Sequence, residues 1–360
     1  MNAATEGVRN GNGRGPDLEE AVLHRYRKAA LKAEAGLCVP VTYDRRLLEV
    51  IPDEILEKDY GCGDPSRHVR EGETVLYQDY VGKKLGYHNV EFRRGKIQNL
   101  RLNLDLIERY LARHPIRSLS DLHELQQFEE KISREQPLIE DESVDAIVSN
   151  CVLNLVRPED KRQLFAEMYR VLKKGGRVAI SDIVSDEPVP EHLSKDPELW
   201  SGCVSGAFQE EEFLPAFEEA KFYGIHVEEM RSEPYRTIEG IEFRSITITA
   251  YKGKEGPCIE RNQAVIYRGP WKLAVDDDNH VLPRGVRIAV CDKTFQIYAK
   301  PPYKDQFILI PPREEIPLEK AGVFDCSRDH KRHPRETKGM DYRVTETSPN
   351  VCGPGSACCL

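Results

Sequence analysis

The sequence lacks several patterns that would define a class of protein at once. It has ten cysteines but no pair with Cys-x-x-Cys spacing, which excludes a zinc ribbon or zinc finger. No apolar run is long enough to cross a membrane. The net charge of −9 argues against the broad basic face that nucleic-acid binding requires. We therefore expect neither a membrane partner nor a nucleic-acid partner.

The N-terminal residues 1–16 also lack a pattern, namely the basic and then apolar order of a secretory signal. They are polar and rich in glycine, so we expect a cytoplasmic protein. In that reducing compartment, cysteines serve as thiols, ligands or catalytic groups more often than as structural disulfides.

Strand and helix patterns alternate in the first two thirds of the chain. Strands are predicted at 73–76, 89–92, 143–150, 177–183, 224–230 and 245–251, and helices at 17–35, 47–60, 159–174 and 210–220. We expect Gly175-Gly176 to end the helix that begins at residue 159. This alternation predicts an α/β fold with a mostly parallel sheet covered on both faces. Ligands bind such sheets beyond the carboxyl ends of the strands, where Asn150-Cys151 and Ser181-Asp182 are expected.

Composition divides the chain into four segments. Residues 1–35 form a flexible segment followed by a helix, and residues 36–252 form the α/β domain. The hinge-like stretch Lys252-Gly-Lys-Glu-Gly-Pro257 leads into a small β-rich domain at 253–345, with strands expected at 264–267, 272–275, 286–291 and 306–310. Residues 346–360 form a cysteine-rich tail that we expect to be disordered.

Three cysteines stand in short, distinctive contexts: Tyr60-Gly-Cys62-Gly63, Ser149-Asn-Cys151 and Leu199-Trp-Ser-Gly-Cys203. Each belongs to a different predicted element, so the three thiols can converge on one soft, thiol-seeking ion. For each of them the alternative is packing as a small hydrophobic residue. Core packing is also our expectation for Cys291, whereas Cys258 and Cys326 have no context that indicates a role.

These cysteine contexts, together with Tyr169-Arg-Val-Leu-Lys-Lys-Gly-Gly176 and Ile180-Ser-Asp182, resemble arsenite methyltransferases over about residues 36–251. The resemblance implies a Rossmann-like class I methyltransferase sheet and S-adenosylmethionine as cofactor. It implies that Cys62, Cys151 and Cys203 hold trivalent arsenic. It also implies a part for Cys38 in a disulfide relay, on the strength of Gly36-Leu-Cys38 alone.

The activity implied by the resemblance is methyl transfer from S-adenosylmethionine to thiol-bound trivalent arsenic, which detoxifies arsenite. Arsenite or its thiol conjugates would be the substrate, and a thiol reductant such as glutathione or thioredoxin would be a partner. Ile97 and Gln98, after the third strand, and Asn150, at the end of the fourth, would contact the cofactor. The arsenic lone pair attacks the methyl carbon in line, so orientation matters and no general base is needed.

The chain departs from the family at its first strand-helix-strand unit. Thirteen residues (77–89) separate Leu76 from Val90, whereas such a unit needs roughly thirty or more. The glycine-rich loop, its helix, the second strand and the acid that binds the ribose are therefore missing, and the sheet is truncated. Gly61-Cys-Gly63 is no substitute, because it follows a polar helical stretch and not a strand.

The truncation leaves other functions open. One is a non-catalytic thiol protein that binds and sequesters arsenite, and another is methylation of a different small molecule. A missing central strand also exposes a sheet edge and apolar helix faces, so we expect lower solubility than for an intact relative.

Overall fold

A computed structural model of the chain describes residues 18–34, 37, 41, 60–77, 91–326 and 331–338. It divides into two compact units, residues 1–253 and 254–360. Cys38, the predicted helix at 47–60 except Tyr60, and the first half of the predicted strand at 89–92 lie outside the described residues. The domain boundaries that we expect at residues 36, 252 and 345 remain predictions.

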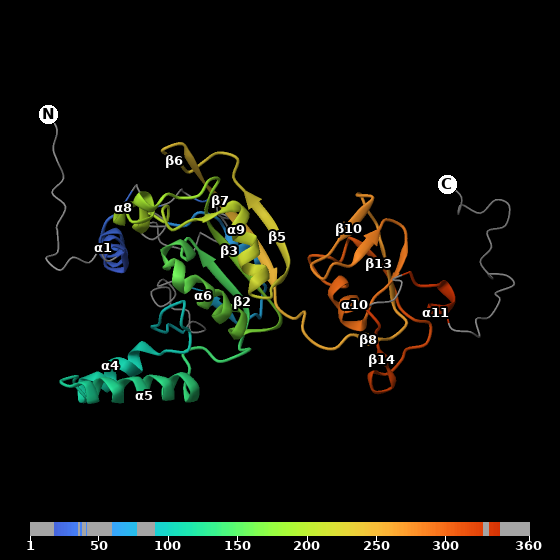
Figure 1. Ribbon diagram of the computed structural model, residues 1–360, viewed down its shortest axis with the longest axis horizontal. Helices are drawn as coiled ribbons and strands as arrows, with labels where there is room; N and C mark the ends of the chain where they lie inside the picture. The colour runs from blue at the N-terminus through green and yellow to red at the C-terminus, as the bar shows by residue number, and fades with distance from the viewer. Residues whose placement is uncertain are drawn as a thin grey trace. The chain divides into compact units, whose positions relative to one another are not determined.

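The first unit contains one large sheet with helices packed against it (Figure 1). Its strands are β1 (Val75–Tyr77), β2 (Val144–Asn150), β3 (Leu172–Ser185), β4 (Phe208–Gln209), β5 (Tyr223–Met230), β6 (Arg236–Ile238) and β7 (Ile241–Tyr251). Its α-helices are α1 (Leu18–Leu31), α4 (Leu104–Arg113), α5 (Leu119–Glu135), α6 (Pro158–Val171), α7 (Glu191–Ser194), α8 (Pro197–Ser201) and α9 (Glu210–Glu219). It also contains two short 3-10 helices, η1 (Pro65–His68) and η2 (Leu153–Leu155).

The strand order is β1-β2-β3-β7-β5, with β4 beside β3 and β6 beside β7. The pairs β1–β2, β2–β3 and β3–β4 are parallel, which confirms the α/β fold, but β7 runs antiparallel to β3, β5 and β6. The expectation of a mostly parallel sheet therefore holds only for one side. The reason is that residues 231–240 alone join β5 to β7, too few for the crossover that a parallel pair requires.

Two predicted elements are corrected by the structure. Helix α6 ends at Val171 and not at residue 174, because Leu172 already pairs with Val144 of β2. Gly175 and Gly176 lie inside β3, where the pairing with β2 shifts register, so they accompany an irregularity of the strand and do not cap a helix. The predicted strand at 89–92 is wrong in its described half, since Glu91 and Phe92 belong to no strand.

Aromatic side chains fix helices α6 and α9 on one face of the sheet. Phe165 of α6 meets Phe217 of α9 with ring centroids 4.7 Å apart in an edge arrangement. Phe213 and Phe222 extend the cluster, at 5.4 and 5.9 Å from Phe217. Edge-to-face pairs of this kind add directional attraction to the burial of apolar area. This packing holds the sheet in place, and the carboxyl ends of β2 and β3 with it.

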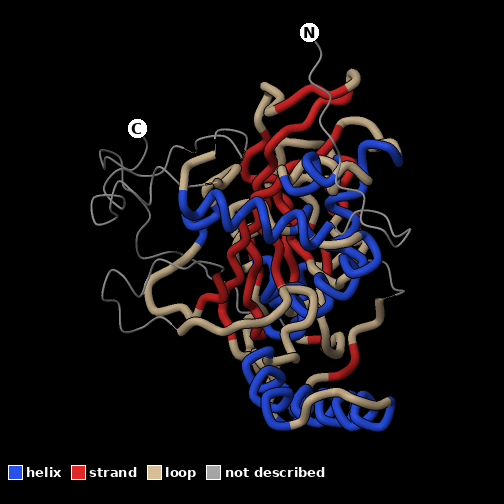
Figure 2. The backbone as a smooth tube through the Cα atoms, turned by 90° about the vertical axis from the view of Figure 1, so that its left-hand side faces the viewer, coloured by secondary structure: helices blue, strands red, loops and turns tan. Residues whose placement is uncertain are grey.

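Helices α4 and α5 lie side by side at one end of the first unit (Figures 1 and 2). Tyr110 stacks on Phe128 with ring centroids 4.2 Å apart, and Ser118 with Asp121 forms a capping box that starts α5. Leu119 of α5 is nevertheless 85% exposed.

The second unit is small and rich in short strands. They are β8 (Ile259–Glu260), β9 (Ala264–Tyr267), β10 (Leu273–Val275), β11 (Val281–Pro283), β12 (Arg287–Ala289), β13 (Phe307–Ile310) and β14 (Gly322–Val323), accompanied by α10 (Asp292–Tyr298), η3 (Leu318–Lys320) and α11 (Pro334–Lys338). β12, β9 and β13 form an antiparallel sheet, and the pairs β10–β11 and β14–β8 stand apart from it. The β-rich character expected from the sequence is therefore confirmed, with β9 at its predicted bounds.

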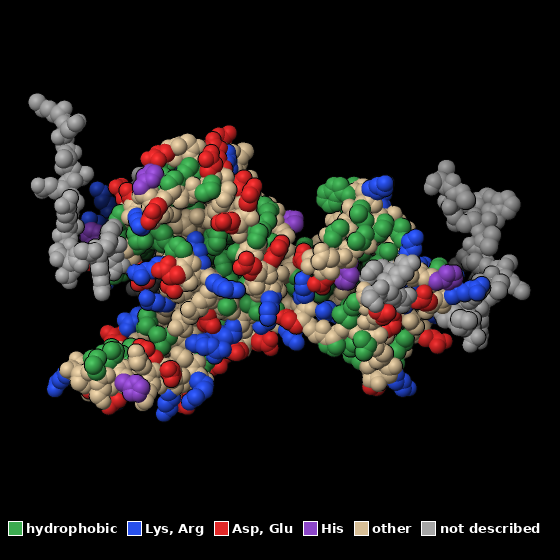
Figure 3. Space-filling model, viewed as in Figure 1, with side chains coloured by type: hydrophobic (Ala, Val, Ile, Leu, Met, Phe, Trp, Pro, Cys, Tyr) green, Lys and Arg blue, Asp and Glu red, His purple; other side chains and the backbone are tan. Residues whose placement is uncertain are grey.

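Acidic and basic side chains are interspersed on the face drawn in Figure 3. Among the described residues, none of the helices combines the length and the apolar character needed to span a bilayer.

Arg177 of β3 ties the segment before β1 to the middle of the sheet. Its guanidinium donates to both carboxylate oxygens of Glu73, at 2.7 and 2.8 Å, and its Nε donates to the His68 carbonyl at 2.7 Å. The Arg177 side chain is 5% exposed and that of Glu73 16%. The hydrogen bonds from Arg177 hold the pKa of the Glu73 carboxyl below its usual range.

We predict that Arg177→Ala destabilises the first unit by about 3 kcal/mol, because it leaves the partly buried Glu73 carboxylate without its partner. A carboxyl with a lowered pKa stabilises the fold above its unfolded pKa, and this contribution disappears as pH falls through the folded pKa. The difference between variant and wild type should therefore shrink in acid. Urea unfolding at pH 7 and pH 4 measures it.

The control for this prediction is Arg134→Ala, which removes an exposed ion pair with Glu135 and should leave stability unchanged. Equal stability of Arg177→Ala and wild type at pH 7 would contradict the prediction.

Candidate functional site

The three cysteines singled out in the sequence are buried in one cluster. Cys62 stands in the turn before η1, Cys151 directly after β2, and Cys203 just after α8, and none is more than 3% exposed. Apolar side chains surround them: Ile183, Leu193, Val204, Ile241 and Phe243. Segments far apart in the chain therefore bring three sulfur atoms into the same water-poor environment.

Two of these cysteines are covalently joined. Cys62 and Cys151 form a disulfide, with Cα atoms 6.1 Å apart. Cys203 is not part of this disulfide, and its Sγ donates to the carbonyl oxygen of Cys151 at 3.2 Å. The convergence expected from the sequence is thus present, whereas the arsenic-binding role of the three residues stays a prediction.

The backbone at two of the cysteines is unusual. Cys151 has φ 55° and Cys203 has φ 59°, the left-handed region that residues with a Cβ rarely adopt. A conformation of this kind costs on the order of 1–3 kcal/mol and persists only where surrounding contacts enforce it. Here the Cys151 amide donates to the Ser181 carbonyl at 2.8 Å, and the Cys203 amide to the Trp200 carbonyl at 3.0 Å. Backbone strain at both positions supports a functional reason for their geometry.

Asn150 holds the Cys62 turn against the end of β2. Its Oδ1 accepts from the Cys62 amide at 2.9 Å, and its Nδ2 donates to the Gly63 carbonyl at 2.9 Å. A Cβ on Gly63 would lie 2.5 Å from the Ser181 Oγ and 2.6 Å from the Thr247 Oγ1, so only glycine allows the turn to come this close. Asn150 therefore positions a cysteine, and its predicted contact with a cofactor stays a prediction.

Asp182 is the residue of this site to which the sequence assigned no role. A carboxylate oxygen of Asp182 and the sulfur atoms of Cys62 and Cys151 all lie within 4.8 Å of one another. The side chain is completely buried and accepts hydrogen bonds from the amides of Val152, at 3.1 Å, and Leu153, at 2.8 Å. The sequence placed Asp182 at the end of a predicted strand, but it gave no indication that Cys62 and Cys151 lie beside it.

The environment of Asp182 disfavours its charge. Burial raises the pKa of Asp182 to about 6, while backbone amide donors, including that of Ile183, and the charge of Lys161 oppose this increase. Burial likewise lowers the pKa of Lys161 to about 8. Lys161 donates to the Gly206 carbonyl at 2.6 Å and so is anchored to the loop that follows Cys203. A proton on Asp182 is therefore exchangeable near neutral pH.

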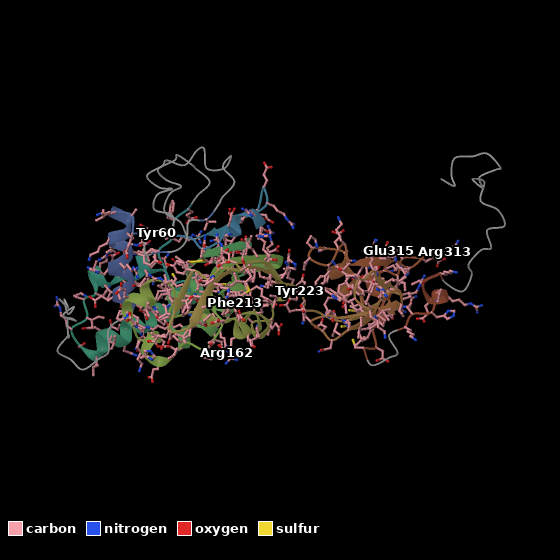
Figure 4. The ribbon with its side chains drawn as sticks, turned by 90° about the horizontal axis from the view of Figure 1, so that it is seen from above. Tyr60, Arg162, Phe213, Tyr223, Arg313 and Glu315 are labelled. Atoms are coloured by element: carbon pink, nitrogen blue, oxygen red, sulfur yellow. A yellow bond between two sulfur atoms is a disulfide. The ribbon has the colours of Figure 1, made fainter. Side chains whose placement is uncertain are left out.

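Helix α1 covers the cysteine cluster. The Tyr26 hydroxyl lies 3.4 Å from the Cys203 sulfur, and Arg25 donates to the Glu198 carbonyl of α8 at 2.7 Å. Tyr60, which Figure 4 labels beside α1, donates to the Ala29 carbonyl at 2.9 Å. The sequence placed α1 in a separate N-terminal segment and gave Tyr26 no part in the site.

The other residues predicted to contact a cofactor lie on a different element. Ile97 and Gln98 are half-buried in the turn between Lys96 and Asn99, and Ile97 packs against the main core. Residues 78–90, which follow β1, lie outside the described part of the chain. The roles of Ile97 and Gln98 stay predictions.

Comparisons with known proteins match both units. Residues 116–221 match the family described as "Methyltransferase domain", and residues 254–342 match the one described as "Domain of unknown function (DUF8838)". Among solved structures, an arsenic(III) S-adenosylmethionine methyltransferase from Chlamydomonas reinhardtii matches 78% of this chain and 98% of its own, with 23% identity and a TM-score of 0.44.

Curated relatives are similar over stretches that range from 25% to 87% of the chain. The arsenite methyltransferase of Homo sapiens is 26% identical over 349 residues, which covers 87% of this chain and 88% of the human protein. That of Aquipseudomonas alcaligenes is 29% identical over 231 residues, covering 61% and 56% of the two chains. That of Halobacterium salinarum is 44% identical over 89 residues, covering 25% and 22%. With a methyltransferase domain matched in its first unit, the chain is similar to an arsenite methyltransferase along most of its length.

Proposed function

We propose that this protein transfers a methyl group from S-adenosylmethionine to trivalent arsenic held by Cys62, Cys151 and Cys203. The observation that supports this best is the burial of the three cysteines, from three separate elements, in one cluster. Arsenite sequestration without catalysis is not favoured, because the relatives along most of the chain are methyltransferases. The protein would work in the cytoplasm, where reducing thiols are available.

Arsenic binding requires the reduced form of the site. Opening the Cys62–Cys151 disulfide takes two electrons, which a thiol reductant such as glutathione or thioredoxin would supply. Arsenite carries three hydroxyl groups, and each is exchanged for a cysteine sulfur with release of water. Three thiols therefore match the three exchangeable positions of the substrate. Cys38 would serve as a further thiol in reopening the disulfide.

The position of Asp182 suits the exchange of arsenic ligands. Its carboxylate can take the proton from a Cys62 or Cys151 thiol and return it to the hydroxide that leaves arsenic, so that water departs and no net proton is consumed. A carboxyl with a pKa of about 6 can accept and release a proton in this way near neutral pH.

Methyl transfer and closure of the disulfide involve the same number of electrons. When bound, S-adenosylmethionine would supply an electrophilic methyl group: the arsenic lone pair would form the new bond to carbon as the sulfur–methyl bond of the donor breaks and its electron pair stays on sulfur. Arsenic is thereby oxidised by two electrons, and closure of the Cys62–Cys151 disulfide returns two electrons to it. The disulfide-bonded site thus corresponds to the enzyme after such a cycle.

The described residues fit the methyl donor only in part. Asn150 stands at the carboxyl end of β2 beside Cys62, but both ends of its carboxamide are engaged by protein groups. Ile97 and Gln98 would contact the donor from the other side. We expect the ribose-binding acid to have no counterpart, because thirteen residues (77–89) leave no room for the unit that carries it.

We predict that Cys151→Ser and Cys203→Ser each lower arsenite methylation at least about 100-fold, because the loss of one sulfur ligand misplaces the reacting lone pair. Cys326→Ser, which removes an exposed thiol of the second unit, should retain full activity. The measurement is transfer of radiolabelled methyl from the donor to arsenite in the presence of glutathione. Wild-type turnover by Cys151→Ser would instead indicate a different methyl acceptor.

We predict that the reduced, arsenite-loaded protein binds S-adenosylmethionine about 10- to 100-fold more weakly than the human relative. The reason is the missing carboxylate, since a hydrogen bond to a charged group contributes roughly 1.5–3 kcal/mol. Isothermal titration of both proteins tests this. Tight arsenite binding without any donor binding would favour sequestration, and equal donor affinities would show that another group receives the ribose.

We predict that Asp182 makes the first unit less stable as pH rises from about 4 to about 6. A raised folded pKa gives stability that is complete below the unfolded pKa and is lost as pH rises through the folded pKa. A shift from 3.8 to about 6 corresponds to about 3 kcal/mol. Asp182→Asn lacks this term, so its stability relative to wild type should improve by about that amount between pH 4 and pH 7.

Urea unfolding followed by the fluorescence of the buried Trp200 measures this stability, with Trp271→Phe in both proteins to remove the second indole. The control is Glu191→Gln, which changes an exposed carboxyl of the same unit and should leave the pH profile unaltered. Parallel pH profiles for wild type and Asp182→Asn would contradict the assignment.

A further inference from the structure

Two further cysteines, to which the sequence assigned no functional role, come together in the second unit. Cys258 directly precedes β8, and Cys291 directly precedes α10. Cys291 is 2% exposed and forms a buried cluster with Ala289 and Phe324, against which the half-buried Cys258 packs. They are separated by 32 residues (259–290) in the sequence, so the fold alone makes them neighbours.

The pairing of short strands fixes the two thiols in place. β8 pairs with β14, and beyond that ladder the Phe324 amide donates to the Cys258 carbonyl at 2.9 Å. On the other side, the Cys291 sulfur lies 3.3 Å from the Thr294 hydroxyl in the first turn of α10. Burial raises the pKa of the Cys291 thiol, and the neighbouring Cys258 raises it further. Both residues are free thiols in the structure.

Among the described residues, the donors at this place are two sulfur atoms. Within the described part of the chain, the only group of three closely spaced Cys, His, Asp or Glu donors is that of Cys62, Cys151 and Asp182. Cys326 follows β14 in the same unit but is exposed, with its sulfur directed to the Phe324 carbonyl at 3.8 Å. A tetrahedral zinc site needs four ligands, so the pair suits a thiol-seeking atom with two exchangeable positions.

We propose that Cys258 and Cys291 form a second dithiol site, which binds trivalent arsenic that already carries one carbon substituent. Such an arsenical has two hydroxyl groups, and the two thiols replace both, so that two As–S bonds form and two water molecules leave without any change of oxidation state. Arsenite would keep one unexchanged hydroxyl at this pair, whereas a monosubstituted arsenical is fully satisfied. The sulfur of Cys258, the more accessible thiol, attacks arsenic first, and Cys291 closes the chelate.

The choice of an arsenical among thiol-binding ligands rests on the proposed function, since the first methylation produces a species of this class. The site lies in a different unit from Cys62, Cys151 and Cys203. It therefore gives the once-methylated species a place to bind that does not occupy the methylating thiols. Each thiol proton leaves with an arsenic hydroxyl group as water, so the exchange leaves no net charge in the site.

The test uses the full chain, reduced with a thiol-free phosphine, and phenylarsine oxide as the monosubstituted trivalent probe. Native mass spectrometry counts the bound equivalents per chain. Cys258→Ser and Cys291→Ser should each bind one equivalent fewer than the wild type. Cys326→Ser is the matched control, because it removes a thiol from the same unit and should bind as many equivalents as the wild type.

Several outcomes overturn the proposal. It fails if Cys258→Ser binds as many equivalents as the wild type, or if Cys326→Ser loses one as well. A misfolded second unit is recognised by the thermal transition of each variant, and Cys258→Ser, at the half-buried position, guards against a folding defect in Cys291→Ser.

Arsenite methylation by the same preparations separates the two proposals. Methylation should be unchanged in Cys258→Ser, because that residue is outside the proposed catalytic cluster. Loss of one probe equivalent supports the second site whether or not the wild type methylates arsenite. Absence of methylation in all the proteins would count against the proposed function and leave the probe count as evidence on the dithiol site alone.

Discussion

The register between β2 and β3 is the constraint on which the cysteine cluster depends. Asn150 pairs with Ser181, so the end of β2 meets the end of β3 at the same level. Just beyond, the Cys151 amide donates to the Ser181 carbonyl, and the Asp182 carboxylate receives the next two amides, of Val152 and Leu153. Because strand side chains alternate in direction, a slip of one residue would turn Asn150 and Asp182 to the opposite faces of the sheet.

Buried polar groups connect this strand pair to the rest of the site. Asn150 carries the Cys62 turn, and Asp182 carries the loop that begins with Cys151. Each forms hydrogen bonds to backbone groups, and a polar side chain that is removed from water needs such partners. The same arrangement puts a carboxyl with a raised pKa beside two sulfur atoms. Packing and chemistry thus use the same hydrogen bonds.

Local sequence patterns predicted those features that neighbouring residues determine. The strand at 264–267 has its predicted bounds, and the contexts of Cys62, Cys151 and Cys203 indicated that these thiols meet. The end of α6 was missed, because Leu172 pairs with a residue of β2 that no local signal reveals. The direction of β7 follows from the short connection after β5, a length that the sequence offered but that the alternation of elements obscured.

The remaining misses concern contacts between distant segments. Tyr26 reaches Cys203 only because α1 packs on α8, and the two are far apart in the chain. Cys258 and Cys291 become neighbours through the pairing of β8 with β14 and the cluster around Phe324. A single sequence contains no periodicity or motif for such contacts. What it did contain was the chemical type of each residue, and this was sufficient for Cys62 and its partners.

The short connection after β1 is expected to affect arsenic binding and methyl-donor binding differently. The described groups around the cysteines include residues of the Cys62 turn, the ends of β2 and β3, α1, α7 and β7, and the segment after α8. Arg177 joins the segment before β1 to β3, which anchors the Cys62 turn to the sheet. Donor binding, by contrast, is expected from the resemblance to depend on a loop and an acid for which residues 77–89 leave no room. We therefore expect arsenic capture to be separable from methyl transfer, because a loss of donor affinity would leave a thiol site that still binds its substrate.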